Sequence, residues 1–439
     1  MNAALRTILS TLLAGAIAWP SARAQQLTFT PFHSDGIYRT GERVGWTVAI
    51  APDQQPAAGR YTYTVKRDGL RVIGTGSFTI PLASPRTTIE TLLREPGMIL
   101  VEVRPPAPDS SFRGASRSEI GRVLLGAAVA PTRILPSAPP PKDFDAFWAA
   151  EIRRLAAVPP QPVLTPGESG RPGVEYFTIQ MNNINGAHVY GQLAKPAGPG
   201  PFPALLIFQW ASPPYPLQKS WVTDRAAEGW MALNVEPHDV PSDMPPAFYA
   251  ALPQIIKNYR TIGQRSRDES YFLAMYLGDY RAAEYLASRQ DWDGKTLVVT
   301  GISMGGQQSF AVAGLDSKVT ALVVDVPAGS DALGPLHGRA AEYPNWDLAR
   351  ADVRATAPYF DVTNFASHIT ARSMVALGFI DETCPPAGVW ATFNRIRGPK
   401  EAVPMADSPH NHIATAAEQA PWARRSAEWL SALVRGATP

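Results

Sequence analysis

Residues 291–310 read DWDGKTLVVTGISMGGQQSF, and this stretch decides the fold. The run Thr296–Thr300 is short, apolar and β-branched, which is typical of a strand buried on both faces of a parallel sheet. Residues 301–305, GISMG, then fit the pattern G-x-S-x-G, and Gln307–Leu315 can form the helix that follows. Glycines on both sides let the backbone crowd into a strained turn without Cβ clashes. The stretch therefore predicts a nucleophilic serine, Ser303, between a buried strand and a helix.

Two downstream residues supply what a serine nucleophile needs. Its hydroxyl is weakly nucleophilic until a histidine accepts the proton and a carboxylate orients that histidine. In this arrangement the chain order is serine, acid, histidine. Asp381 directly follows the strand-like run MVALGFI, and His410 comes later in the segment SPHNH. The order predicts Ser303 as nucleophile, Asp381 as acid and His410 as base.

Other residues compete for the acid and base roles. Asp325 also ends a predicted strand, although a capping or pairing role within its own loop is favoured for it. Glu382 is next to Asp381 and would point away from it if the turn is tight. His412 is two residues beyond His410 and stays open as an alternative base.

The pattern around this stretch predicts an α/β fold. Beyond Asp143, the expected N-cap of an amphipathic helix, short apolar runs alternate with helical stretches such as Tyr271–Ser288. This alternation is typical of a mostly parallel sheet with helices on both faces. The apolar runs are Ala204–Phe208, Met231–Val235, Thr296–Thr300, Ala321–Val326 and Met374–Leu377, and a last helix is expected over about 414–434.

The N-terminal part has a different pattern. Residues 27–129 alternate with period two between Gly, Pro and Asp breaks, which predicts a small immunoglobulin-like β-sandwich over 25–130. It holds no titratable cluster, so a packing or spacer role is favoured over carbohydrate binding. Residues 131–142, PTRILPSAPPPK, form a proline-rich connector, and residues 143–437 form the predicted catalytic domain. A length of 439 residues suits two domains of ~100–200 residues or more.

Residues 1–24 are typical of a secretory signal peptide. Arg6 precedes an apolar run, Ile8–Trp19, and Ala22-Arg23-Ala24 fits the small-x-small cleavage pattern. The run is too short to span ~30 Å of hydrocarbon as a helix. We therefore expect a secreted or periplasmic protein that begins near Gln25 and has no membrane contact after cleavage.

Charge and cysteine content exclude several classes of protein. The chain has 40 Lys and Arg against 38 Asp and Glu, and removing Arg6 and Arg23 with the signal makes the two numbers equal. A neutral protein fits a neutral substrate better than nucleic acid. The single cysteine, Cys384, excludes an intrachain disulfide and is interpreted as a packed residue rather than a nucleophile. There is no H-E-x-x-H zinc motif and no complete P-loop, so neither a metal nor another cofactor is expected.

From about Pro141 to the C-terminus the chain resembles the acetyl xylan esterase and cephalosporin C deacetylase family. The resemblance rests on motifs that occur in the family's order, namely residues 140–152, 185–196, 201–208, 291–310, 323–331, 359–369, 378–386 and 409–412. It implies an α/β-hydrolase fold and the removal of O-acetyl groups from carbohydrates and some small esters. Carried over by motif, the nucleophile, acid and base would again be Ser303, Asp381 and His410.

The chain departs from the family at several loops. Residues 209–211, Gln-Trp-Ala, stand where the family has a His-Gly-Tyr type of loop, so by position one oxyanion N–H would come from Ala211. The other would come from Met304, where the family usually has glutamine. Residues 237–239, Pro-His-Asp, replace the family's Arg-Gly-Gln, and 409–411 read Pro-His-Asn in place of Gly-His-Glu. The N-terminal domain is absent from the typical single-domain form.

The predicted function is an exported serine esterase that deacetylates carbohydrates such as acetylated xylan or xylo-oligosaccharides. Trp210, Tyr215 and Trp221 are candidates for stacking on a sugar ring, with plain packing equally open, and His238 is a candidate substrate contact. A serine peptidase on the same core, or a non-catalytic binding protein, are the alternatives. The short N-terminal domain argues against the first, and the intact serine, acid, histidine order argues against the second. The oligomeric state is left open.

Overall fold

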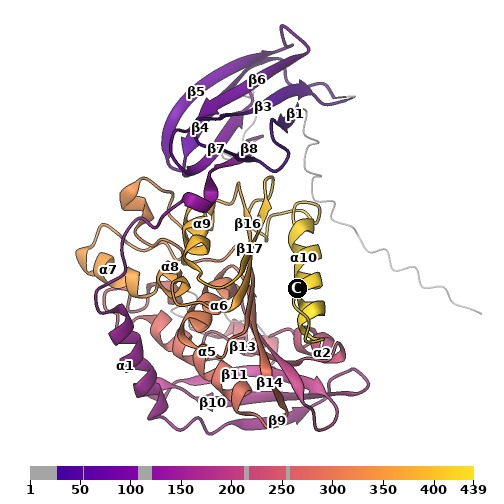
Figure 1. Cartoon of the computed structure of the whole chain (residues 1–439), viewed down its shortest axis with the longest axis vertical. Coiled ribbons are helices and arrows are strands. Elements are labelled where there is room, and N and C mark those ends of the chain that lie inside the picture. The colour runs from indigo at the N-terminus through magenta and orange to yellow at the C-terminus, as the bar shows by residue number, and fades with distance from the viewer. Residues whose placement is uncertain (1–26, 53, 107–120, 212–216, 254–257) are drawn as a thin grey trace, which may run out of the picture.

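Three sheets organise the chain in the computed structural model, which describes residues 27–52, 54–106, 121–211, 217–253 and 258–439. Two of them form the N-terminal domain, and the third is the centre of the larger C-terminal domain (Figure 1). The signal peptide predicted over 1–24 and the candidate Tyr215 lie outside the described residues.

The N-terminal domain has a three-stranded and a five-stranded sheet that share one apolar core. Val44, Trp46 and Ile89 of the first sheet belong to the same buried cluster as Ile99 and Val101 of the second. The three-stranded sheet has the order β1 (Leu27–Pro31), β3 (Arg43–Ile50), β6 (Arg86–Leu92). The other has the order β2 (Ile37–Tyr38), β8 (Val123–Val129), β7 (Gly97–Arg104), β4 (Gly59–Arg67), β5 (Arg71–Ile80).

The C-terminal domain is built on a nine-stranded sheet whose larger part is parallel, which confirms the predicted α/β class. The six strands from β17 to β13 pair in parallel, whereas β11, β10 and β9 join on the far side in antiparallel pairs. In sheet order the strands are β17 (Lys400–Met405), β16 (Arg372–Gly378), β15 (Ala321–Asp325), β14 (Trp292–Ile302), β12 (Phe202–Phe208), β13 (Met231–Glu236), β11 (His188–Pro196), β10 (Val174–Asn182) and β9 (Val163–Gly167).

Helices cover both faces of this sheet (Figure 1). Alternate residues of β14 point to opposite faces: Leu297 and Val299 pack in one cluster with residues of α5, α6, α8 and α9, and Val298 packs in another with α2 and α10. Within the described residues the α-helices are α1 (Phe144–Ala156), α2 (Ser220–Ala227), α3 (Pro246–Ala250), α5 (Tyr271–Ser288), α6 (Met304–Leu315), α7 (Ala351–Thr356), α8 (Val362–Ala366), α9 (Pro386–Arg395) and α10 (Ala420–Leu433). The 3-10 helices are η1 (Pro131–Arg133), η2 (Ile184–Gly186), η3 (Tyr259–Thr261), η4 (Gly334–His337) and η5 (Ala357–Tyr359).

Asp143 stands at the N-cap of α1, as predicted, but its side chain makes no capping bond. Its carboxylate instead accepts hydrogen bonds from Tyr359 Oη and from Arg267 Nη1. Tertiary partners therefore replace the local capping interaction that the sequence suggested.

The connector and the N-terminal domain both pack on the C-terminal domain. Ile134 of the connector is buried, and Ser137 donates from its backbone N–H to Asp331. In β8, Gly126 lies so close to Phe379 that an added Cβ would come within 2.5 Å of the phenylalanine Cβ. Arg122 forms an ion pair with Glu382. The N-terminal domain thus contacts the segment that follows β16.

Among the described residues, no helix combines the length and the apolar character that crossing a membrane requires.

Candidate active site

Ser303 occupies a strained turn between β14 and α6. Its φ of 57° and ψ of −119° lie in a region that residues other than glycine rarely adopt. A Cβ at Gly301 would lie 2.3 Å from the carbonyl carbon of Gly305, and a Cβ at Gly305 would lie 2.4 Å from the backbone oxygen of Phe208. Both glycines of the G-x-S-x-G pattern are therefore required by close backbone approach, as the sequence predicted.

The three residues predicted from chain order form one line of hydrogen bonds. His410 Nε2 lies 3.0 Å from Ser303 Oγ, and His410 Nδ1 lies 2.7 Å from Asp381 Oδ2. All three side chains are at most 5% exposed. With Nδ1–H donating to the carboxylate, Nε2 is left to accept the serine proton, so the arrangement can generate a nucleophilic alkoxide.

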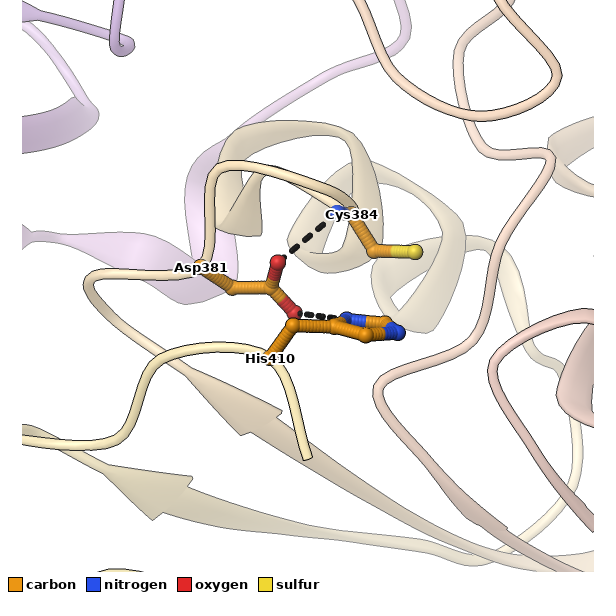
Figure 2. A group of neighbouring side chains, drawn as sticks. All are labelled: Asp381, Cys384 and His410. Carbon is orange, nitrogen blue, oxygen red and sulfur yellow. Dashed lines mark hydrogen bonds and ion pairs between the residues drawn. The ribbon is translucent and has the colours of Figure 1, made fainter. Parts of the chain in front are cut away.

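Backbone donors fix the carboxylate of Asp381. Its Oδ1 accepts hydrogen bonds from the N–H groups of Thr383 and Cys384, both at 2.8 Å, while Oδ2 faces the imidazole (Figure 2). The strands explain why these distant residues meet: β14, β16 and β17 run parallel, and Ser303, Asp381 and His410 each follow one of them. Functional groups gather at the carboxyl edge of such sheets.

The competing residues take other roles in the structure. Both side-chain oxygens of Asp325 are buried without a hydrogen-bond partner among the described residues, and its backbone oxygen accepts from Ser303 N–H. His412 packs edge-on against His410, with ring centroids 5.3 Å apart, and the contact with Ser303 comes from His410. Glu382 pairs with Arg122.

Cys384 lies beside this line of residues. In Figure 2 its sulfur is on the same side of the loop as the imidazole of His410. Burial, and then the charge of Asp381, raise the pKa of the thiol well above its usual value, and a hydrogen bond with Ser303 opposes that shift. A thiol held protonated is a poor nucleophile, which agrees with its interpretation as a packed residue.

Asp381, Cys384 and His410 also form a group in which one ligand atom from each residue lies within 4.8 Å of the others. Their chemistry fits a metal poorly, however, because His410 Nδ1 already bonds Asp381 and burial keeps the thiol neutral. An ion held by all three residues would compete with the hydrogen bonds that Asp381 and His410 already make.

The two candidate oxyanion donors belong to segments that lie against each other. Met304 is the first residue of α6, and Ala211 follows β12 by three residues. Gln308 Nε2 donates to the backbone oxygen of Gln209 over 2.9 Å, which ties the loop to the helix. This packing is compatible with two N–H groups converging near Ser303, and the donor roles remain a prediction.

Two tyrosines contact the side chain of Met304. Neither of them was identified from the sequence. The hydroxyl groups of Tyr259 and Tyr343 lie 2.6 Å apart, and they lie 3.4 and 3.2 Å from Met304 Sδ. Because each hydroxyl has one proton, one of them donates to the other, and that second hydroxyl is free to donate to the sulfur. Neither tyrosine has a motif spacing relative to residues 301–305, so only tertiary structure reveals the contact.

The aromatic candidates divide into two groups. Trp210 and Trp221 pack edge-on with ring centroids 4.9 Å apart, and Trp221 also packs against the cluster beneath α2 and α10. His238 lies elsewhere: its Nδ1 is 2.6 Å from the hydroxyl of Tyr271, and its ring is 4.5 Å from that of Tyr259. The role of His238 as a substrate contact remains a prediction.

Comparison with known proteins identifies the family to which the chain belongs. The family model described as Acetyl xylan esterase (AXE1) matches residues 133–333 and 345–427, which include all three residues of the hydrogen-bonded line. The chain belongs to the acetyl xylan esterase family. Membership makes it a carboxylic-ester hydrolase.

The individual proteins that are similar to this chain are named as acetyl esterases or acetyl xylan esterases. It is 29% identical over 391 residues to the acetyl esterase Axe7A of Xylanibacter ruminicola, a match that covers 87% of this chain and 86% of that protein. The acetyl xylan esterase from Paenibacillus sp. R4 superposes with a TM-score of 0.57 at 24% identity, over 68% of this chain and 98% of that one. Acetyl xylan esterase 1 from Thermoanaerobacterium sp. JW/SL YS485 gives 0.56 at 20% identity, over 69% and 96%. At these identities the two solved structures show a shared fold.

We predict that Asp325→Asn weakens the pH dependence of stability. Burial, and then the charge of Asp381, raise the pKa of Asp325 from 3.8 to about 8. Between these values the folded protein keeps a proton that the unfolded chain releases, so this group's contribution to stability is full below pH 3.8 and is lost as the pH rises to about 8. Denaturant unfolding across that window should show a shallower fall for the variant than for the wild type. Parallel slopes would contradict the assignment.

Proposed function

We propose that this chain is a serine esterase that removes O-acetyl groups from carbohydrates such as acetylated xylan or xylo-oligosaccharides. The observation that carries the proposal is the line of hydrogen bonds from Ser303 through His410 to Asp381, at the carboxyl edge of the sheet. Family membership supports an ester as the substrate. The proposal includes an α/β-hydrolase fold for the C-terminal domain.

In the proposed acylation step, Ser303 Oγ attacks the carbonyl carbon of the acetyl ester while His410 Nε2 accepts its proton. Asp381 holds the imidazole in the required tautomer and stabilises the imidazolium that forms. The N–H groups of Met304 and Ala211 would donate to the tetrahedral oxyanion, where one donor is typically worth about 10²–10³ in rate.

To complete acylation, the bond between the acetyl carbon and the sugar oxygen breaks, the imidazolium of His410 gives its proton to that oxygen, and the sugar leaves with a free hydroxyl while the acetyl group stays on Ser303. Water then attacks the acetyl-enzyme with His410 again as base, which releases acetate and restores the serine. Membership of an esterase family argues against the two alternatives, a serine peptidase and a non-catalytic binding protein.

We also propose that the chain is exported, because residues 1–24 fit a signal peptide. We further propose that the N-terminal domain is an immunoglobulin-like β-sandwich. In an exported protein it would pack against the catalytic domain outside the cytoplasm. N-terminal sequencing of the protein recovered from the periplasm or medium should begin near Gln25. A protein retained in the cytoplasm with its first residues intact would contradict export.

Single substitutions at the site should separate the proposed roles. Ser303→Ala and His410→Ala should each lower acetate release from acetylated xylo-oligosaccharides by more than about 10³-fold, because they remove the nucleophile or its base. His412→Ala is the matched control and should keep most of the activity, because its exposed ring packs against His410 and the bond to Ser303 comes from His410. Acetate release would be measured on proteins shown by circular dichroism to be folded. Equal losses for the two histidine variants would contradict the choice of His410.

A further inference from the structure

The N-terminal domain packs against the chain segment that leads to the proposed catalytic acid. Strands β7 and β8 lie on the side of this domain that faces β16 and α9 (Figure 1). Met98 of β7 and Ala128 of β8 belong to the same buried cluster as Phe379, the residue that directly follows β16. The contact therefore falls two residues before Asp381.

The approach of β8 to Phe379 leaves no room for a side chain. A Cβ added at Gly126 would lie 2.5 Å from the Phe379 Cβ and 2.9 Å from the Phe379 backbone oxygen, well inside the optimal separation of about 3.5–4.0 Å. Because one of these atoms belongs to the backbone, rotation of the phenylalanine side chain cannot relieve the clash. A glycine in β8 thus sets the distance between this strand and the backbone of the next segment.

Phe379 also connects to the segment of the proposed catalytic base. Its backbone N–H donates to the oxygen of Met405 over 3.0 Å. Gly36 of the N-terminal domain lies against both segments, since an added Cβ would be 3.3 Å from the Phe379 ring and 3.3 Å from the Ala406 Cβ. One side of the N-terminal domain therefore contacts the chain before the acid and the chain before the base.

A second contact, on the other side of the acid, is ionic. Arg122 Nη1 lies 3.1 Å from Glu382 Oε1, and Nη2 bonds the other carboxylate oxygen. Two N–H groups on one carboxylate give such a pair a defined orientation. Because Glu382 is the residue after Asp381, the N-terminal domain holds the chain both before and after the acid.

We propose that the N-terminal domain fixes the acid loop, residues 379–384, in the geometry that the reaction needs. Gly126 and Arg122 are then positioning residues, which act on Asp381 through Phe379 and Glu382. This role gives the domain a function in catalysis without any contact with the substrate.

The position of the acid loop matters because the loop itself bonds the carboxylate. The N–H groups of Thr383 and Cys384 donate to Asp381 Oδ1, while Oδ2 lies 2.7 Å from His410 Nδ1. A shift of the loop therefore moves the carboxylate relative to the imidazole, and a displacement of about 1 Å at a distance from the reacting atoms can cost about 10²-fold in rate. The inference rests on the proposed function, because the histidine acts only as the base of Ser303.

Gly126→Ala tests the proposal in the full-length protein, with hydrolysis of p-nitrophenyl acetate as the readout. We expect kcat to fall at least about tenfold while KM stays within about twofold, because the added methyl group displaces the acid loop and leaves the ester-binding groups in place. Gly74→Ala is the matched control and should keep the wild-type kcat. It adds the same group to β5 of the same sheet, where the nearest atoms, those of Val65, are 3.9 Å away.

A second background separates positioning from a general loss of folded protein. We expect Gly126→Ala to slow fluorophosphonate labelling of Ser303 at least about tenfold when Asp381 is present. In Asp381→Asn the carboxylate to be positioned is gone, so adding Gly126→Ala should slow labelling no further. Equal slowing in both backgrounds would overturn the proposal, because the loss would then be unrelated to the acid.

Arg122→Gln is the second variant and keeps the test valid if Gly126→Ala does not fold. It breaks the ion pair with Glu382, and because an exposed pair contributes modestly, we expect kcat to fall about threefold. Arg43→Gln breaks an exposed ion pair with Glu90 in the three-stranded sheet and should keep the wild-type kcat. Wild-type kcat in every folded variant at Gly126 and Arg122 would overturn the proposal.

The labelling experiment also distinguishes this inference from the proposed function. Labelling that slows as expected, in a wild-type protein that releases no acetate from acetylated xylo-oligosaccharides, would contradict the deacetylation and support the positioning role. Acetate release by the wild type with unchanged labelling in folded Gly126→Ala would support the esterase and contradict the positioning role.

Discussion

The positive φ of Ser303 is the constraint on which the candidate site depends. The turn directs Oγ to a point 3.0 Å from His410 Nε2, and it can form only where the neighbouring backbone comes unusually close. Gly301 and Gly305 permit that approach, and the Ser303 N–H bond to the backbone oxygen of Asp325 anchors the turn to the next strand. Strain at one residue is therefore maintained by the packing of several strands, a common feature of functional sites.

Two buried acids lie near the line of hydrogen bonds, and their raised pKa values keep them uncharged. Asp325 and Glu342 are buried and lack side-chain hydrogen-bond partners among the described residues, and burial raises the pKa of both. An acid kept protonated near Asp381 adds no like charge beside it. The imidazolium of His410 would then face one ionised carboxylate in this group, that of Asp381, which accepts a hydrogen bond from its Nδ1–H.

Much of the parallel sheet and the proposed triad could be predicted from the sequence. The central strands stand out as short apolar runs, and the three residues of the triad follow the chain order serine, acid, histidine. Helix α5 has the predicted bounds, and the strand within residues 296–300 extends to 292–302. Strands β10 and β11 were not predicted as strands, because polar residues such as Gln192 interrupt their apolar pattern. Gln192 is nevertheless buried, since it donates to the backbone oxygen of Leu217. Helix α10 begins at Ala420 rather than near 414. The contact of Tyr259 and Tyr343 with Met304 could not be foreseen, because these residues come from segments that only tertiary structure brings together.

The N-terminal domain contacts the segment that carries Asp381, through the ion pair of Arg122 with Glu382 and the close approach of Gly126 to Phe379. The central claim is that Ser303 is a nucleophile activated by His410. Labelling with a fluorophosphonate probe, followed by peptide mapping by mass spectrometry, tests it most directly. The account predicts a single adduct on Ser303, formed at least about 10²-fold more slowly in His410→Ala. An adduct on another residue, or an unchanged labelling rate in that variant, would contradict it.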